Sequence, residues 1–130
     1  MKLEIISMER VLLRDDVDMV VAPAWDGEVG ILPNHAPMIT MLQPGEVRIR
    51  KGGEEQYIFV SGGFLEVRDN RVVILSDIAE RAEEIDIEEA RRRAEEARKE
   101  MPKDLAKAEA ALRRELMRMK VAEKRKRRTG

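Results

Sequence analysis

The sequence has no cysteine, a single histidine, and aromatic side chains at only 3% of its 130 positions. The absence of cysteine excludes disulfides, thiolate nucleophiles and thiolate metal sites. No apolar run approaches the roughly 20 residues that a membrane-spanning helix requires, and we expect no secretory signal peptide, because the first residues lack an apolar core. With 39% Asp, Glu, Lys and Arg, the chain has the composition of a soluble protein of one domain or two very small ones.

Charge is distributed unevenly along the chain, although the net charge is only −1. Residues 1–84 carry 9 Lys and Arg against 16 Asp and Glu, a net of −7. Residues 85–130 carry 16 against 10, a net of +6. This division predicts two modules with different partners, the second of which is attracted to something acidic.

Residues 1–84 have the pattern of short antiparallel strands. Glu46–Arg50 alternates apolar and charged side chains, as a half-buried strand does. Turn signals recur about every ten residues, which favours a sandwich or barrel; they are Gly52–Gly53, Gly62–Gly63 and Asp69–Asn70. Pro23 and the segment 26–37 are expected to interrupt the strands as a break and a loop.

Residues 85–130 are rich in Ala, Glu, Arg, Lys, Leu and Met, which are strong helix formers. Asp86 is placed to cap a first helix, and Pro102 to end it. Apolar residues at helical spacing form one stripe on each helix: Ile87, Ala90, Ala94, Ala97 and Met101 on the first, and Leu105, Ala108, Leu112, Leu116 and Met119 on the second. Two stripes joined by a short turn predict an antiparallel two-helix hairpin.

The seam of this hairpin is predicted to be weak. Burying an alanine methyl contributes roughly 0.8 kcal/mol, against 1.5–3 kcal/mol for a leucine or valine, whereas ordering each backbone residue costs about 1–2 kcal/mol. A seam made largely of alanines is easily opened. The hairpin is therefore either a conformational switch or a floppy tail.

The stretch GEVGILPNHAPM, residues 27–38, contains the single histidine, His35. A catalytic histidine requires a proton donor and an orienting group, and one histidine with scattered carboxylates lacks metal-ligand spacing. Proline fixes φ and glycine permits positive φ, so this loop is built to hold one shape. A rigid loop bearing Glu28 and His35 favours a docking surface over a plain structural turn or a catalytic site.

The second helix and the tail concentrate nine Lys and Arg within positions 113–128. No aromatic residue lies beyond Phe64, which argues against nucleic-acid binding because bases have nothing to stack on. Arg114 and Arg118 are one helical turn apart, a spacing that suits an acidic protein helix or a phosphate equally well. A solvated charged face is the remaining alternative.

Four stretches together resemble the epsilon-subunit family of bacterial rotary ATP synthases. They are VDMVVAP, GEVGILPNHAPMITMLQPGEVRIR, SGGFLEV and ILSDIAERAEEIDIEEA, and the likeness runs from about residue 3 to residue 124. It implies a β-sandwich of about ten short strands over residues 1–84, followed by a regulatory two-helix hairpin with a basic tail over 85–130. It also implies a non-catalytic subunit without a cofactor.

In that family the sandwich packs against the gamma subunit, and its loop lies against the polar loops of the c-ring. The resemblance therefore implies a rotor-docking surface, made by Glu28, Val29, Gly30 and His35. It places the protein at the cytoplasmic face of the bacterial cell membrane, in contact with the membrane only indirectly, through the complex.

The hairpin of that family is either folded or extended toward an acidic segment of the beta subunit, where it hinders ATP hydrolysis. The resemblance thus implies a contact with the alpha and beta catalytic subunits through basic residues of the second helix, Arg113, Arg114, Arg118 and Lys120. Such a contact weakens as salt rises.

In some bacilli the folded hairpin binds ATP through an I-D-x-x-R-A motif and later arginines. The matching positions here are Ile85, Asp86, Ala90, Arg114 and Arg118, but the motif arginine is Glu89 and a further arginine position is Glu96. Two anions in place of two cations repel a triphosphate, so we expect ATP binding to be weak or absent unless Arg91, Arg92 or Arg93 substitutes. The alternatives for the whole chain are a small nucleic-acid-binding adaptor and, last, a small enzyme using His35.

Overall fold

The computed structural model describes residues 1–101 and 103–129, and the chain divides into two compact units, Met1–Arg81 and Ala82–Gly130. The boundary expected from the sequence, after Glu84, lies three residues later in the chain than the observed one, after Arg81. The difference is the short 3-10 helix η1 (Ala82–Glu84), which belongs with the second unit.

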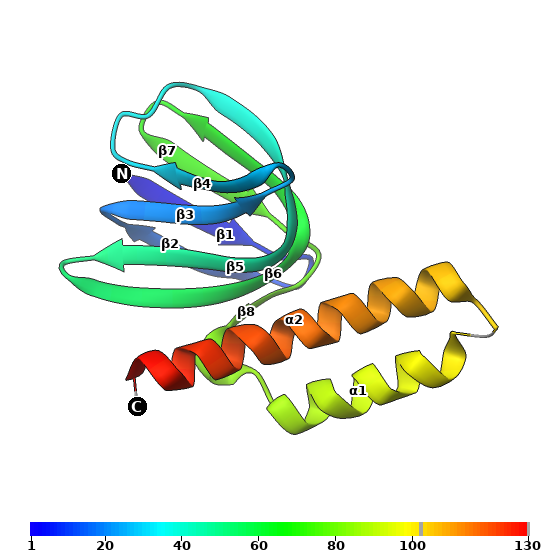
Figure 1. Ribbon diagram of the computed structural model, residues 1–130. Helices are drawn as coiled ribbons and strands as arrows, with labels where there is room; N and C mark the ends of the chain where they lie inside the picture. Colours follow the sequence, from blue (N-terminus) through cyan, green and yellow to red (C-terminus); the bar gives the residue numbers. More distant parts are fainter. Residues whose placement is uncertain (102, 130) are drawn as a thin grey trace. The chain divides into compact units, whose positions relative to one another are not determined.

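The first unit is a β-sandwich, as the sequence predicted (Figure 1). Its strands follow the order β2-β1-β7-β6-β5-β3-β4, with β8 also paired to β6. All pairs are antiparallel except β1 with β7. The strands are β1 (Lys2–Ile6), β2 (Val11–Asp16), β3 (Met19–Ala24), β4 (Gly27–Ile31), β5 (Met38–Lys51), β6 (Glu54–Arg68), β7 (Arg71–Leu75) and β8 (Ala79–Arg81).

Strands β5 and β6 are long, and each contributes to both layers of the sandwich. The first half of β5 and the second half of β6 lie beside β7, β1 and β2, whereas their other halves lie beside β3, β4 and β8. Each layer thus has five strand segments, ten in all, and because β5 and β6 each contribute two of them, the described residues form eight strands where about ten were expected. The glycines at 62–63 bend β6 without ending it, because their φ angles of 110° and 121° allow a kink within the strand,.

The core lies between the two layers and is made of alternate residues from each strand,. Val47 and Ile49 of β5 and Ile58 and Val60 of β6 belong to this core, with Val47 paired to Ile58, and all four are no more than 1% exposed. Burial of such side chains contributes roughly 1.5–3 kcal/mol each. The alternation seen at Glu46–Arg50 therefore identified an inward-facing set correctly.

Two tight turns that the sequence predicted are confirmed. Gly52–Gly53 joins β5 to β6 with φ angles of 58° and 84°, and Asp69–Asn70 joins β6 to β7 with 52° and 60°. Two successive positive φ angles are the mark of a type I′ turn, whose twist matches that of a β-hairpin.

The expected loop over residues 26–37 is wrong in part. Gly27–Ile31 forms β4, which pairs with β3, and only residues 32–37 remain a loop. Pro23 does not interrupt β3 either. The pairing of β3 with β5 shifts register between Val21 and Ala24, so the missing N–H of Pro23 falls where the ladder is already irregular.

The second unit is the predicted antiparallel hairpin of α1 (Ile87–Glu100) and α2 (Leu105–Thr129) (Figure 1). Asp86 caps α1 as expected, because its side chain accepts a hydrogen bond from the Glu89 N–H at 3.0 Å. Asp104 accepts from the Lys107 N–H at 3.2 Å at the start of α2, a cap that the sequence analysis did not use. Pro102, the expected end of the first helix, lies outside the described residues.

The stripe predicted for the first helix is confirmed, whereas that of the second is rotated. Ala90, Ala94 and Ala97 are buried on α1. On α2, Ala108 is buried, but Leu105 and Leu116 are 58% and 40% exposed. The inward face instead carries a charged pair, Glu115 and Arg118, in its middle, and Leu105 and Leu116 are displaced from it. The buried residues of α2 are Ala108, Glu115, Arg118, Val121 and Ala122.

Gly63 is the glycine that tolerates a side chain least. A Cβ there would lie 1.9 Å from the Leu75 carbonyl oxygen, with φ at +121°. Gly63→Ala is expected to destabilise the sandwich by about 3 kcal/mol or more, from strain and overpacking together. The measurement is urea unfolding followed by near-UV circular dichroism, because every aromatic residue lies within the first 64 positions and reports the sandwich alone. Gly30→Ala is the control, since nothing lies within 4 Å of its Cβ; equal midpoints for both variants would contradict the expectation.

Candidate functional site

The loop of residues 32–37 connects β4 to β5 and is held in one conformation. The His35 N–H donates to the Leu32 carbonyl at 3.2 Å, and the His35 Nδ1 lies 2.7 Å from the Ala36 carbonyl oxygen. Asn34 has a φ of 66°, and its N–H donates to the Asn70 Oδ1 at 2.8 Å. With Pro33 and Pro37 in addition, the backbone has little freedom. Of the loop expected from the sequence, the part over residues 32–37 is present, whereas the glycines at 27 and 30 belong to β4.

The residues predicted for docking are all accessible but do not form one cluster. Glu28 and Gly30 are exposed, and Val29 and His35 are partly buried. Glu28 lies near the start of β4, about 10 Å along the strand from Ile31 at ~3.3 Å per residue, whereas His35 lies beyond the end of β4. Glu28 and His35 therefore do not meet as a charged pair. They belong to one strand–loop segment.

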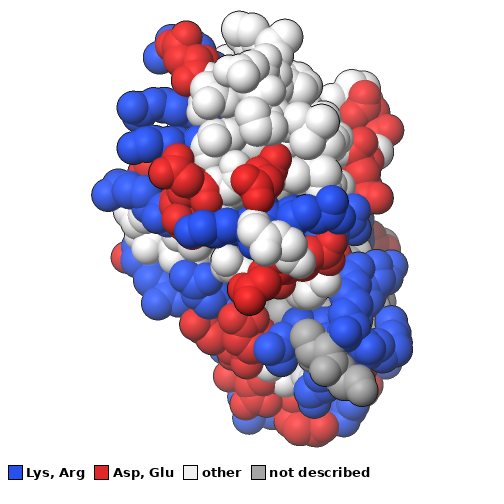
Figure 2. Space-filling view, turned by 90° about the vertical axis from the view of Figure 1, so that its left-hand side faces the viewer, with Lys and Arg blue, Asp and Glu red and all other residues white. Residues whose placement is uncertain are grey.

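The loop and the strand segments that flank it are uncharged, although the neighbouring turn carries Arg68 and Asp69, whose side chains are 72% and 87% exposed. No Asp, Glu, Lys or Arg occurs between Glu28 and Glu46. Figure 2 looks at the side on which the N-terminus and the 32–37 loop lie, and it shows a broad uncharged area above a band of alternating acidic and basic side chains. The loop thus offers backbone groups, one imidazole and apolar side chains to a partner.

A row of apolar side chains crosses the outer face of the layer formed by β2, β1, β7, β6 and β5. The register pairs Met41 with Phe64, Phe64 with Leu75, Ile6 with Leu75, and Ile6 with Val11. Four of the five residues are between 46% and 57% exposed. We call Met41, Phe64, Leu75, Ile6 and Val11 the apolar row. The apolar row was not predicted from the sequence, although Phe64 and Leu75 occupy the face of their strands where polar residues are expected.

The apolar row borders a hollow of about 360 Å³. Its lining includes Ile6, Met8 and Phe64 together with the glycines at 62–63. Met8 is 81% exposed. A contiguous exposed apolar surface of this kind is characteristic of a protein–protein contact.

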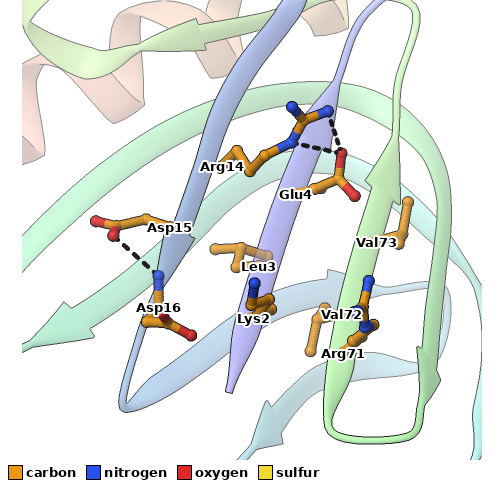
Figure 3. A pocket seen from close by; sticks show the side chains of 9 residues that line it. All are labelled: Lys2, Leu3, Glu4, Arg14, Asp15, Asp16, Arg71, Val72 and Val73. Atoms are coloured by element: carbon orange, nitrogen blue, oxygen red, sulfur yellow. Dashed lines mark hydrogen bonds and ion pairs between the residues drawn. The ribbon is translucent and has the colours of Figure 1, made fainter.

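A second hollow on the same layer, of about 430 Å³, is lined mainly by charged residues (Figure 3). Arg14 binds Glu4 through its Nε and Nη2 at 3.1 and 2.9 Å. The Lys51 ammonium lies 2.8 Å from both Asp15 oxygens, which lowers the pKa of Asp15 and raises that of Lys51. The lining has three acids and three bases, and it has neither a histidine nor a serine, threonine or tyrosine hydroxyl. It does not resemble an active site.

The hairpin contains a buried ion cluster in its seam. Arg118 and Glu115, with side chains only 5% and 1% exposed, are joined by an Nη1–Oε1 contact of 2.5 Å. Arg118 also reaches Glu89 of α1, with 3.7 Å between Nη2 and Oε1. Glu115 receives a second bond from the Arg114 Nε at 3.0 Å, and Arg93 lies 3.4 Å from Glu89. Of these contacts, the one between Arg118 and Glu89 connects the two helices, and the buried residues around the cluster are mostly alanines, with Val121.

The positions that match the nucleotide motif are divided between two places. Ile85 and Asp86 line a hollow of about 560 Å³ near the start of α1. Arg114 and Arg118 belong to the ion cluster, and Ala90 is fully buried. Glu89 forms ion pairs with Arg118 and Arg93. Glu96 is 65% exposed and lies 4.0 Å from Arg92.

The basic residues predicted to contact another protein differ in accessibility. Arg113 and Lys120 are exposed, and Arg114 is partly buried. Arg118 is 4% exposed. The first two are open to a partner while the hairpin has this form, Arg114 is open in part with its side chain 37% exposed, and Arg118 is closed off.

Neither a metal centre nor a membrane-spanning helix is found in the described part of the chain. No group of three or more His, Asp or Glu side chains among the described residues is arranged to hold a metal ion. No helix there is long and apolar enough to cross a membrane.

Comparison with known sequences points to one family. The family model described as "ATP synthase, Delta/Epsilon chain, beta-sandwich domain" matches residues 1–82. The ATP synthase epsilon chain of Dehalococcoides mccartyi is 54% identical over 132 residues, covering 97% of this chain and 94% of that protein. The epsilon chain of Herpetosiphon aurantiacus is 52% identical, covering 98% and 97%.

Two solved structures are similar in fold. A chain in the cryo-EM structure of the Euglena gracilis mitochondrial ATP synthase, OSCP/F1/c-ring in rotational state 1, matches with a TM-score of 0.70 and 26% identity, over 98% of this chain and 80% of that one. A chain from the Tetrahymena thermophila mitochondrial ATP synthase, central stalk/c-ring, gives 0.56 at 20% identity, over 69% of each chain. The second likeness concerns the fold alone.

The ion cluster leads to a prediction for the hairpin. Arg118→Ala leaves the buried Glu115 carboxylate with Arg114 as its remaining basic partner. Breaking a buried ion pair lowers the free energy of unfolding by about 3–5 kcal/mol. The helical signal at 222 nm is expected to be lost at a lower temperature than in the parent chain, while the near-UV signal of the sandwich is unchanged.

Two comparisons make this prediction specific. Arg92→Ala removes an exposed base, 68% accessible and 4.0 Å from Glu96, and is expected to change stability by less than about 0.5 kcal/mol. Glu115→Met combined with Arg118→Met removes both charges and is expected to restore the helix. A helical transition that is unchanged in Arg118→Ala would show that the cluster does not hold the seam.

Proposed function

The chain belongs to the ATP synthase delta/epsilon chain family, as an epsilon subunit, and from this premise we propose that it fastens the gamma subunit to the c-ring and restrains ATP hydrolysis through its hairpin. It is a non-catalytic subunit of the rotary enzyme, in the central stalk. The observation that carries the proposal is that the sandwich offers two unpartnered surfaces of different chemistry, the rigid 32–37 loop and the apolar row.

We assign the gamma subunit to the apolar row. A permanent partner covers apolar surface that is costly to leave in water, and the central part of such an interface is depleted of charge. The row has these properties, with Met41, Phe64 and Leu75 about half exposed.

We assign the c-ring to the strand–loop segment that carries Glu28, Val29, Gly30 and His35. A loop that is ordered before binding loses less conformational entropy on docking. Its exposed Glu28 supplies a charge at one end, and His35 supplies an imidazole at the other. In this arrangement the subunit lies at the cytoplasmic side of the membrane and reaches the membrane through the ring.

The hairpin is proposed to regulate the catalytic alpha and beta subunits through the basic face of α2. Arg113 and Lys120 are exposed and can meet an acidic partner directly. Arg114 and Arg118 are committed to Glu115 and Glu89. Full engagement of all four basic residues therefore requires the hairpin to open, and the ion cluster opposes that opening.

The inhibitory role is tested with ATP hydrolysis by an alpha–beta–gamma complex. Combined Arg113→Glu and Lys120→Glu substitutions are expected to weaken inhibition roughly fivefold or more, because charge reversal at an interface turns attraction into repulsion. Added salt is expected to weaken inhibition by the parent chain as well. Lys99→Glu with Lys103→Glu, an equal charge change at exposed positions elsewhere on the hairpin, is the control. Equal inhibition by both double variants would exclude this contact.

ATP is proposed to bind weakly or not at all. Glu89 places a carboxylate within 3.7 Å of Arg118 and 3.4 Å of Arg93, so the cations that a triphosphate requires are already neutralised. In a calorimetric titration of the full chain, we expect a dissociation constant of roughly 1 mM or weaker, corresponding to about −4 kcal/mol or less favourable. Micromolar affinity would contradict this. Glu89→Arg is the informative variant, expected to tighten ATP binding by supplying the missing cation.

A further inference from the structure

We infer that Asn70 is a positioning residue for the 32–37 loop, acting through its side-chain oxygen. This role rests on the proposed docking of that loop to the c-ring. Asn70 is 36 residues away from Asn34 in sequence, yet its Oδ1 lies 2.8 Å from the Asn34 nitrogen. The bond links the loop to the turn between β6 and β7, which no other hydrogen bond of the described loop residues does.

The loop depends on this bond because of its own backbone. Pro33 and Pro37 have no N–H to donate, and the His35 N–H is used inside the loop, by Leu32. Asn34 has a left-handed backbone, with φ at 66°, a conformation that costs free energy for any residue with a side chain. The Asn70 acceptor offsets that cost and fixes the direction of the Asn34 peptide.

The identity of residue 70 supports a role for its side chain. In a type I′ turn the second position favours glycine, because φ is positive there. Asn70 has a φ of 60°, so the turn alone would be satisfied at least as well by glycine. Asparagine is the residue that tolerates this backbone and also presents an oxygen to the loop.

The backbone of Asn70 is fixed from the opposite side. Its carbonyl oxygen accepts the Lys2 N–H at 3.1 Å, and Lys2 begins β1, which pairs with β7 from Arg71 onward. Asn70 thus joins three segments that are distant in sequence. The loop is positioned by the rigid sheet rather than by its own two ends alone.

The test compares three variants of the full-length chain. Asn70→Gly keeps the positive φ and removes the oxygen, whereas Asn70→Asp keeps both. Asp69→Gly is the matched control, since Asp69 shares the turn and a positive φ of 52°, but its side chain forms an ion pair with the neighbouring Arg68, at 3.9 Å. Solvent exchange of the Asn34 amide, measured by NMR, is expected to accelerate about fivefold in Asn70→Gly and to change little in the other two. Unchanged exchange in Asn70→Gly, or equal acceleration in Asp69→Gly, overturns the inference.

Binding to a purified c-ring in detergent separates this inference from the proposed function. Asn70→Gly is expected to weaken binding about three- to tenfold, because the loop must then be ordered on docking, and Asn70→Asp is expected to bind like the parent chain. His35→Ala tests the docking itself. If His35→Ala and Asn70→Gly both leave the affinity unchanged while Asn34 exchange accelerates, the loop is not the docking surface, but Asn70 still positions it.

Discussion

The pairing of β5 with β6 is the interaction on which the rest of the first unit depends. These strands are paired from Met38↔Val67 to Lys51↔Glu54, and every other strand of the sandwich joins this ladder directly or through one or two intervening strands. Its bend at the glycines of residues 62–63 divides it between two layers and encloses the core. The same bend leaves Met41 and Phe64 on the outer face. The core and the apolar row are therefore two faces of one ladder.

The hairpin combines a weak apolar seam with a strongly specific polar contact. Alanine methyls contribute little free energy and fix neither the rotation nor the register of two helices. The Glu115–Arg118 pair and its contact with Glu89 supply that definition, since a buried charge tolerates few alternative arrangements. The two helices can therefore pack in a single arrangement although the free energy that holds them together is small. This property suits an element that takes two positions.

The sequence predicted both units, the alanine stripe of α1 and the turns at Gly52–Gly53 and Asp69–Asn70, because period-two and period-3.6 patterns and turn residues act locally. Prediction from the sequence failed for features that depend on contacts between residues distant in sequence. The length of β6 depends on what the kinked glycines pack against, and β4 forms because β3 is beside it. The burial of Glu115 and Arg118 in the seam could not be predicted, since two charged residues on a helix ordinarily indicate a solvated face. The hydrogen bond between Asn70 and Asn34 could not be predicted either, because neither local segment has a pattern that indicates it.

The two long strands also have a mechanical consequence. A sandwich whose layers are joined only by loops can shear, one layer sliding over the other, when a torque acts across it. Here β5 and β6 pass from one layer into the other as continuous, mutually hydrogen-bonded strands, so sliding would require many backbone hydrogen bonds to break together. A load applied at one end of the sandwich is carried to the other by the backbone itself, and the first unit should behave as a stiff coupling in a rotating shaft.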